Sequence, residues 1–270
     1  MSARPSHLPD FLRPPINEVV LGVQFAPSPS YQQMHAFEVW ELFKADYPTT
    51  QEHPPIVPAF ETFGRPQVGK FNIEFETGVM PTRYWFISPG GNELIQFQSD
   101  RLLHNWRQVS GEANVPYPRF DVLLGRFESE IAAISAYFAQ QRSHKLVINQ
   151  CELSYINNIP FDVVGANLGR WLSFLDFPMS DPDDLAAKFR YTVRSADGKP
   201  LARLTCELST GVSADESKRI IIFNLTFRGA PTESTPKGAL DLLRRGRSEI
   251  VTKFTELTSD LAHKDWERTQ

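Results

Sequence analysis

The sequence predicts an α+β fold in which two similar halves form one curved antiparallel sheet with helices on one face. The chain has 270 residues, of which 41% are apolar and 22% are charged, a composition typical of globular proteins and not of disordered or fibrous ones. Strand-like segments occur in runs between helices, which favours an antiparallel sheet over a doubly wound parallel one. The order strand, helix, antiparallel strands, long helix occurs twice along the chain. Because the halves share little residue identity, we infer a duplicated topology and not a sequence repeat.

We divide the chain into three parts. Residues 1–16 are expected to form an extended N-terminal arm, because they contain four prolines and lack the periodicity of a core element. Residues 17–144 make up the first half and residues 145–270 the second, and their first strands, near 19–25 and 151–159, should occupy equivalent places. This order of elements resembles that of the TATA-binding protein, a likeness of topology that implies no function.

The first half begins with a strand over residues 17–25, in which alternate residues are apolar. These are Val19, Leu21, Val23 and Phe25. A helix is expected over residues 31–47, after a serine cap and before Pro48. Its apolar stripe consists of Met34, Phe37, Leu42 and Phe43, with Trp40 nearby. Residues 48–58 are rich in proline and are expected to form a loop.

Short strands and a long helix complete the first half. The strands are expected over residues 71–75, 84–87 and 94–103, with a turn at 89–92, and a meander is the simplest arrangement. The strongest helical pattern in the chain follows over residues 120–138, where apolar residues recur at spacings of three and four. They are Phe120, Leu123, Leu124, Phe127, Ile131, Ile134 and Phe138.

The second half repeats this order. A strand is expected over residues 147–159, then a short helix over 167–177, and then a hairpin whose strands flank the turn Asp197-Gly198. The hairpin strands are residues 189–193 and 201–208, and a further strand covers 219–228. A long final helix carries an apolar stripe. The stripe consists of Leu243, Ile250, Phe254, Leu257 and Leu261.

Cysteine usage and hydropathy predict a cytoplasmic protein. Cys151 and Cys206 both lie in apolar strand-like segments, where buried and reduced thiols are the usual case. No segment approaches the roughly 20 apolar residues that span a bilayer, and the N-terminal residues lack the apolar stretch of a signal peptide. With a net charge of −4, the chain has no overall basic footprint for nucleic acid.

The sequence contains no strong catalytic or cofactor motif. Glycine-rich phosphate or dinucleotide motifs, a nucleophile elbow, a metalloprotease motif and paired C-x-x-C motifs are all missing, and the six histidines are scattered without ligand spacing. Asp181, Asp183 and Asp184 form a close acidic group, for which helix capping or a solvated turn is favoured over metal binding. We therefore assign no catalytic residue, cofactor or metal.

The best candidate for a binding site is the segment 100–107, which combines an acid, two arginines, a histidine, an amide and an indole. Strand alternation places Arg101, Asn105 and Arg107 on one side of the sheet, with His104 and Trp106 on the other. We assign the first three residues to ligand binding, since guanidinium groups bind anions and stack on planar groups. The alternative is structural, with a buried Trp106 and arginines paired to nearby carboxylates.

Other polar residues occupy otherwise apolar strands. Asn158, Asn224 and Arg228 are assigned to the same ligand-binding face, and the alternative is that they end strands by hydrogen bonding to the main chain. The only dense basic cluster is Arg244, Arg245 and Arg247, which spreads over most of the helix circumference. A solvated helix face is the favoured interpretation of this cluster, and contact with nucleic acid or an acidic partner is the alternative.

Three parts of the chain resemble a known family. They are residues 14–20 (PPINEVV), residues 97–107 (FQSDRLLHNWR) with 117–119 (YPR) after them, and residues 152–159 (ELSYINNI). Over nearly its whole length the chain is similar to a sporadically distributed prokaryotic family of uncharacterised proteins. The final helix is also similar, except that Glu267 stands where the family usually has glycine after the tryptophan, here Trp266. The resemblance implies no activity, cofactor or catalytic residue.

The leading hypothesis is a non-enzymatic ligand-binding or interaction protein that uses the surface of its curved sheet. Its partner would be a small molecule or another protein, with nucleic acid less favoured and a membrane not expected. The alternatives are an enzyme of unknown class with dispersed site residues and a nucleic-acid-binding protein. A deep pocket with convergent polar groups would favour the enzyme, a broad groove the binding protein, and a positive concave face the nucleic-acid partner.

Overall fold

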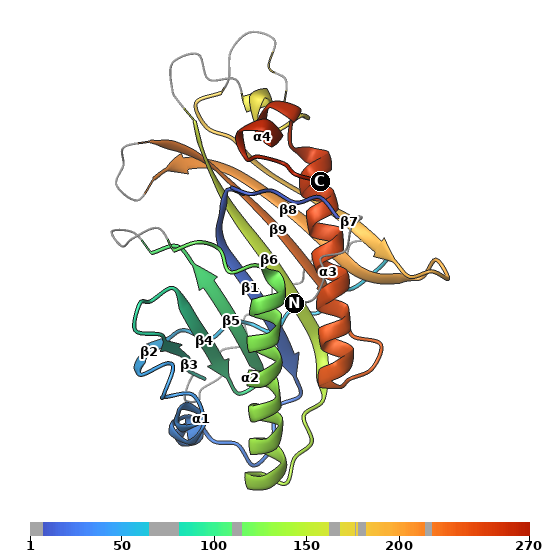
Figure 1. Ribbon diagram of the computed structural model, residues 1–270. Coiled ribbons are helices and arrows are strands. Elements are labelled where there is room, and N and C mark those ends of the chain that lie inside the picture. Colours follow the sequence, from blue (N-terminus) through green and yellow to red (C-terminus); the bar gives the residue numbers. More distant parts are fainter. Residues whose placement is uncertain are drawn as a thin grey trace.

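A computed structural model describes residues 8–64, 81–109, 115–161, 168–175, 177, 182–213 and 218–270 (Figure 1). Within these ranges, nine strands form one open sheet, and every pair of neighbouring strands is antiparallel. Four α-helices accompany the sheet in the same part of the chain. The predicted α+β class with an antiparallel sheet is therefore confirmed.

The strand order across the sheet is β2-β3-β4-β5-β1-β6-β9-β8-β7. The first five strands are β1 (Ile16–Phe25), β2 (Thr49–His53), β3 (Arg83–Ile87), β4 (Glu93–Gln98) and β5 (Arg101–Arg107). The others are β6 (Ile148–Phe161), β7 (Ala186–Arg194), β8 (Pro200–Val212) and β9 (Arg219–Gly229). Strands β1 and β6 are neighbours in the middle of the sheet, and β2 and β7 form its edges.

Two long helices, α2 (Phe120–Gln141) and α3 (Pro236–Leu257), lie side by side over the same face of the sheet (Figure 1). The hydrophobic core fills the space between them and the strands, because alternate strand residues point toward the helices. On β1 these residues are Val19, Leu21, Val23 and Phe25, all nearly inaccessible to solvent. A Cβ atom at Gly246 of α3 would lie 2.6 Å from the Phe227 ring of β9, so this glycine permits the close approach of helix and sheet.

The helix predicted over residues 31–47 is much shorter in the structure. It comprises a 3-10 turn (Gln33–His35) and α1 (Ala36–Glu41), and it is followed by turns up to Tyr47. The residues it buries are Ala36, Val39, Phe43 and Tyr47. The predicted stripe was wrong except at Phe43, since Met34, Phe37 and Leu42 are exposed. Apolar residues occur on more than one side of this short helix, and the stacking of Phe43 on Phe86 of β3 fixes the side that is buried.

Two strand boundaries in the first half also differ from the prediction. Residues 94–103 were expected to form one strand, but a turn at Ser99-Asp100 divides the region into β4 and β5. β2 lies where a loop was expected; it contains only polar residues and pairs through its main chain with β3. The strand expected over residues 71–75 lies outside the described residues.

The second half follows the prediction more closely. Strands β6, β8 and β9 and the hairpin at Asp197-Gly198 are confirmed, with Gly198 in the left-handed region at φ 80°. The helix expected over 167–177 is limited, in its described part, to a 3-10 turn (Leu168–Arg170). The final helix ends at Leu257, since Thr258 and Ser259 adopt extended conformations, and α4 (Asp260–Asp265) follows. Leu261 therefore lies on α4 and is exposed.

Residues 8–15 form no helix or continuous strand and lie against the C-terminal residues. The main-chain amides of Leu12 and Arg13 donate to the carbonyls of Glu267 and Trp266, both at 3.1 Å, and Phe11 is buried. Cys151 and Cys206 are both buried, and neither forms a disulfide, as predicted. Among the described residues, no helix has the length and apolarity needed to cross a bilayer.

Candidate functional site

The six predicted site residues share one face of the sheet, the face turned away from α2 and α3. Residues paired across neighbouring strands lie on the same face of the sheet. Three β5 residues pair with β1 residues that alternate with its core residues: Arg101 with Gln24, Asn105 with Val20, and Arg107 with Glu18. Asn158 of β6 and Asn224 and Arg228 of β9 occupy the same face by alternation. We call this surface the strap face, after the segment that crosses it.

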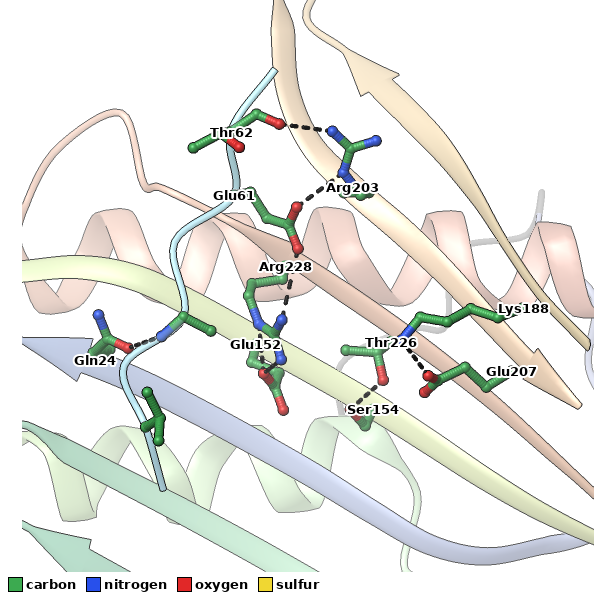
Figure 2. A network of polar contacts seen from close by, with 12 residues as sticks. Gln24, Glu61, Thr62, Glu152, Ser154, Lys188, Arg203, Glu207, Thr226 and Arg228 are labelled. Carbon is green, nitrogen blue, oxygen red and sulfur yellow. Dashed lines mark hydrogen bonds and ion pairs between the residues drawn. The ribbon is translucent and has the colours of Figure 1, made fainter. Parts of the chain in front are cut away.

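Residues 54–64 cross the strap face in an extended path, and we call this segment the strap (Figure 2). It leaves the edge strand β2 and passes over β4, β5 and β1 toward β9 and β8. In Figure 2 the helices lie behind the sheet and the strap in front of it. The strap therefore covers a face that the two long helices leave free.

Side chains of the sheet hold the strap mainly by its main chain. The Gln98 amide accepts a hydrogen bond from the Ile56 N–H at 2.9 Å and donates one to the Ile56 carbonyl at 3.1 Å. Gln24 accepts from the Ala59 N–H at 3.1 Å. Arginines donate to the carbonyls of Pro54, Val57 and Thr62; these arginines are Arg83, Arg101 and Arg203. Five strands thus supply side chains that bind the polypeptide backbone of the strap.

One strap side chain makes ionic contacts with the sheet. The Glu61 carboxylate lies 2.9 Å from Arg203 Nε and 3.6 Å from Arg228 Nη1 (Figure 2). Arg228 also pairs with Glu152 of β6, with Nε 2.7 Å from Oε2. The side chains of Glu61 and Arg203 are 15% and 18% exposed, so water screens this contact only partly. Arg203 also lies 5.2 Å from the ring of Phe63, so Glu61 and Phe63 add side-chain contacts to an interaction made mainly by the main chain.

The strap buries polar groups beneath it. Arg101 and Asp100 are each only 7% exposed, and Gln98 donates to the Asp100 carboxylate at 2.9 Å. Burial raises the pKa of Asp100, and the nearby Arg101 and Gln98 act in the opposite direction. Burial lowers the pKa of Arg101, and the charge of Asp100 acts in the opposite direction. Each charge thus offsets part of the cost of burying the other, and burial remains the larger effect on both pKa values.

A small cavity of about 20 Å³ lies between the strap and strands β1, β5, β6 and β9. Arg101 and Gln150, 7% and 6% exposed, both line it. Arg101 Nε, a donor, and Gln150 Oε1, an acceptor, find no hydrogen-bond partner among the described residues. A buried polar atom without a partner costs about 1–3 kcal/mol, so the strap leaves this part of the face incompletely satisfied.

A second polar cluster lies on the strap face at the other end of β5. The Trp85 ring of β3 stacks on His53 with centroids 3.9 Å apart, and the Arg107 guanidinium lies 5.5 Å from the Trp85 ring. Asn105 is only 3% exposed; it accepts from Gln96 at 2.9 Å and donates to Glu18 at 2.6 Å. Asn105 thus links neighbouring side chains of the sheet. Arg107 is more accessible to solvent than Asn105.

The remaining predicted residues are not brought together with these clusters. Asn158 and Asn224 are half-buried, with Asn224 accepting from Thr226 at 3.3 Å. The arginines of the α3 cluster each have an acidic partner: Arg244 with Asp241, Arg245 with Glu249, and Arg247 with Asp121. Asp183 and Asp184 precede β7 in a loop, and Asp181 lies outside the described residues. Where the structure describes the chain, no three acidic, histidine or cysteine side chains gather as a metal site.

Most residues that hold the strap were not predicted from the sequence. They are Gln24, Gln98, Glu61, Glu152 and Arg203, with Gln96 and Trp85 in the second cluster. A usable pattern was present on β4, where Gln96 and Gln98 alternate with the core residues Ile95 and Phe97. Alternation alone does not indicate that a distant loop would contact them.

Comparisons with known proteins return nothing similar: no family model, no curated protein and no solved structure matches the chain.

Proposed function

We propose that this protein is a non-enzymatic interaction protein that binds an extended polypeptide segment of a partner on its strap face, in exchange with its own strap. The observation that carries the proposal is the set of hydrogen bonds from sheet side chains to the strap main chain. A surface that holds one extended segment through its backbone has the donors and acceptors to hold another.

Such a surface tolerates many sequences, because every residue except proline offers the same N–H and C=O groups. The Gln98 amide contacts both main-chain groups of Ile56, so it imitates a strand partner at that residue. Preference would come from Arg203 and Arg228, which hold the Glu61 carboxylate. The partner segment is therefore expected to be extended and to carry an acidic residue at the place of Glu61.

Two features of the strap support exchange. Arg101 Nε and Gln150 Oε1 lack hydrogen-bond partners in the described part of the chain, so a segment that supplies them would be held more firmly than the strap. The strap also turns Val57 and Phe60 outward, 79% and 57% exposed, and their side chains add little to holding it. Both features lower the free energy needed to displace it.

The charge pattern of the strap face favours a polypeptide over nucleic acid. Its arginines face carboxylates of the same surface: Arg203 and Arg228 contact Glu61, and Arg228 also contacts Glu152. A nucleic-acid site needs basic side chains that are free to neutralise phosphates. The ion pairs also distinguish this broad surface from a catalytic pocket with convergent polar groups.

We also propose the internal duplication predicted from the sequence, in which β1 and β6 are equivalent first strands. The order β5-β4-β3-β2 outward from β1 and the order β9-β8-β7 outward from β6 support it, as does the position of α2 and α3 after the last strand of each half. The suggested family membership and a cytoplasmic location remain part of this proposal, supported by the three sequence segments and by the two free thiols.

The proposal is tested by selecting random peptides displayed on phage against the full-length Glu61→Gln variant, in which the strap is weakened. We expect enrichment of peptides that share an acidic residue, and loss of that enrichment when Arg203→Gln and Arg228→Gln are added. If no peptide is enriched over a surface without protein, the proposal fails. If single-stranded oligonucleotides bind with a steep salt dependence while no peptide is enriched, the nucleic-acid alternative replaces it.

A further inference from the structure

The cavity beneath the strap lies over a row of three residues on neighbouring strands. Gln24 of β1 pairs in register with Arg101 of β5 on one side and with Gln150 of β6 on the other. Gln24 also accepts a hydrogen bond from the Ala59 N–H at 3.1 Å, so the strap crosses the middle of the row at Ala59. Within the strap it is Ala59 that lines the cavity, together with the three residues of the row.

The side chain of Ala59 points toward the sheet. Glu61, two residues later, forms ion pairs with arginines of the sheet, whereas Phe60 between them is exposed. Because side chains alternate along an extended chain, Ala59 shares the inward side with Glu61. Its N–H already binds Gln24, and its methyl group offers no polar atom. The strap therefore presents an apolar side chain to a cavity that has polar walls.

Two atoms of opposite hydrogen-bonding character belong to these walls. Arg101 Nε can only donate and Gln150 Oε1 can only accept, and neither has a partner in the ranges that the structure describes. A carboxylate in the cavity would repel Gln150 Oε1 and the Glu152 carboxylate, which also lines it. An ammonium group would repel the guanidinium groups of Arg101 and Arg228. A neutral group that both donates and accepts is the best match.

The volume of the cavity admits one non-hydrogen atom. Its size of about 20 Å³ slightly exceeds the roughly 10–15 Å³ that a single water molecule needs. A serine side chain at the place of Ala59 adds one oxygen atom, which has one proton to donate and two lone pairs to accept. Larger polar side chains, such as that of asparagine, exceed the volume. A water molecule could make the same bonds, and a peptide hydroxyl that replaces it keeps those bonds and releases the water.

We propose that the partner segment carries serine at the place of Ala59 and an acidic residue two positions later, at the place of Glu61. The sequence recognised in an extended segment is then serine, any residue, and glutamate or aspartate. This inference rests on the function proposed above and adds a second side-chain requirement to it. Because the strap has alanine at this place, a partner with serine binds more firmly than the strap and displaces it.

The test compares three fluorescent peptides of residues 54–64 in anisotropy titrations with the Glu61→Gln protein. One has the native strap sequence, one has serine at the place of Ala59, and one has 2-aminobutyrate there, whose extra methyl group has about the size of the hydroxyl but forms no hydrogen bond. The serine peptide should bind at least about 5-fold more tightly than the other two. Adding Gln150→Met to the protein removes the acceptor, so this advantage should shrink to about 2-fold.

The same change in the full-length chain gives a measurement that needs no partner. Ala59→Ser should hold the strap more firmly, so native-state hydrogen exchange of the Ile56 N–H should slow at least about 5-fold. Equal binding of the serine and aminobutyrate peptides, or unchanged exchange at Ile56, would overturn the serine requirement, while the proposed function stands if the native peptide binds. Slowed exchange without binding of any of the three peptides would instead contradict the proposed function, and the partner sequence with it.

Discussion

The substitution Glu61→Gln should loosen the strap without unfolding the protein. Glu61 is the one strap side chain described with ionic contacts to the sheet, at 2.9 Å from Arg203 and 3.6 Å from Arg228. A hydrogen bond to a charged group contributes about 1.5–3 kcal/mol, and the neutral amide retains part of it. Arg228 still pairs with Glu152 in the variant. We therefore expect the free energy that favours the closed strap to fall by about 1–2 kcal/mol, so that the fraction of molecules with an open strap rises about 5–30-fold.

Native-state hydrogen exchange measures this change directly. The N–H groups of Ile56 and Ala59 donate to Gln98 and Gln24, so each opening of the strap exposes them. Their exchange should accelerate about 5–30-fold in the variant, while the core amides of β1 exchange as before. Glu207→Gln is the matched control, because Glu207 pairs with Lys188 on the same face away from the strap. Acceleration below about 2-fold, or an equal change in the control, would refute the role of Glu61.

Three further predictions concern the core. Trp106→Ala should lower the free energy of unfolding by about 3–5 kcal/mol in urea titrations, because the indole is 1% exposed; a loss below about 1 kcal/mol would contradict its burial. Glu130 forms hydrogen bonds with His104 at 2.8 Å and with Tyr47 at 3.3 Å. Glu130→Ala should therefore lower the free energy of unfolding by about 1–3 kcal/mol for each of these partners, and Glu130→Gln should lower it less. Burial raises the pKa of the Cys151 thiol to about 12. Since the unfolded chain loses this proton from about pH 9, the free energy of unfolding should fall above that pH by about 1.4 kcal/mol per unit for this thiol, and Cys151→Ala should reduce the slope.

The sequence was sufficient for elements whose apolar residues fit a single period. The long helix over Phe120–Gln141 and the strands containing Val19 and Leu153 were predicted because one face of each is continuous and apolar. The helix after residue 31 failed because several apolar stripes fit its sequence, and packing of Val39 and Phe43 selects one of them. Strand β2 is polar throughout and is held by pairing with β3, so no local pattern predicts it.

The candidate site was predicted in part. Alternation placed Arg101, Asn105 and Arg107 on one face and Trp106 in the core, as the register of β5 with β1 shows. Accessibility was beyond the sequence, because the burial of Arg101 depends on the strap, which is 44 residues away from it at Val57. Long-range contact of a loop with a sheet leaves no periodic trace in either segment.

Binding of extended polypeptide to the strap face can be measured with the strap sequence supplied in trans. A fluorescent peptide of residues 54–64, PPIVPAFETFG, would be titrated with the Glu61→Gln protein and its anisotropy recorded. We expect saturable binding that is weakened at least about 10-fold when lysine replaces the glutamate of the peptide, or when Arg203→Gln and Arg228→Gln are added to the protein. Absence of saturable binding, or equal binding of the glutamate and lysine peptides, would contradict it.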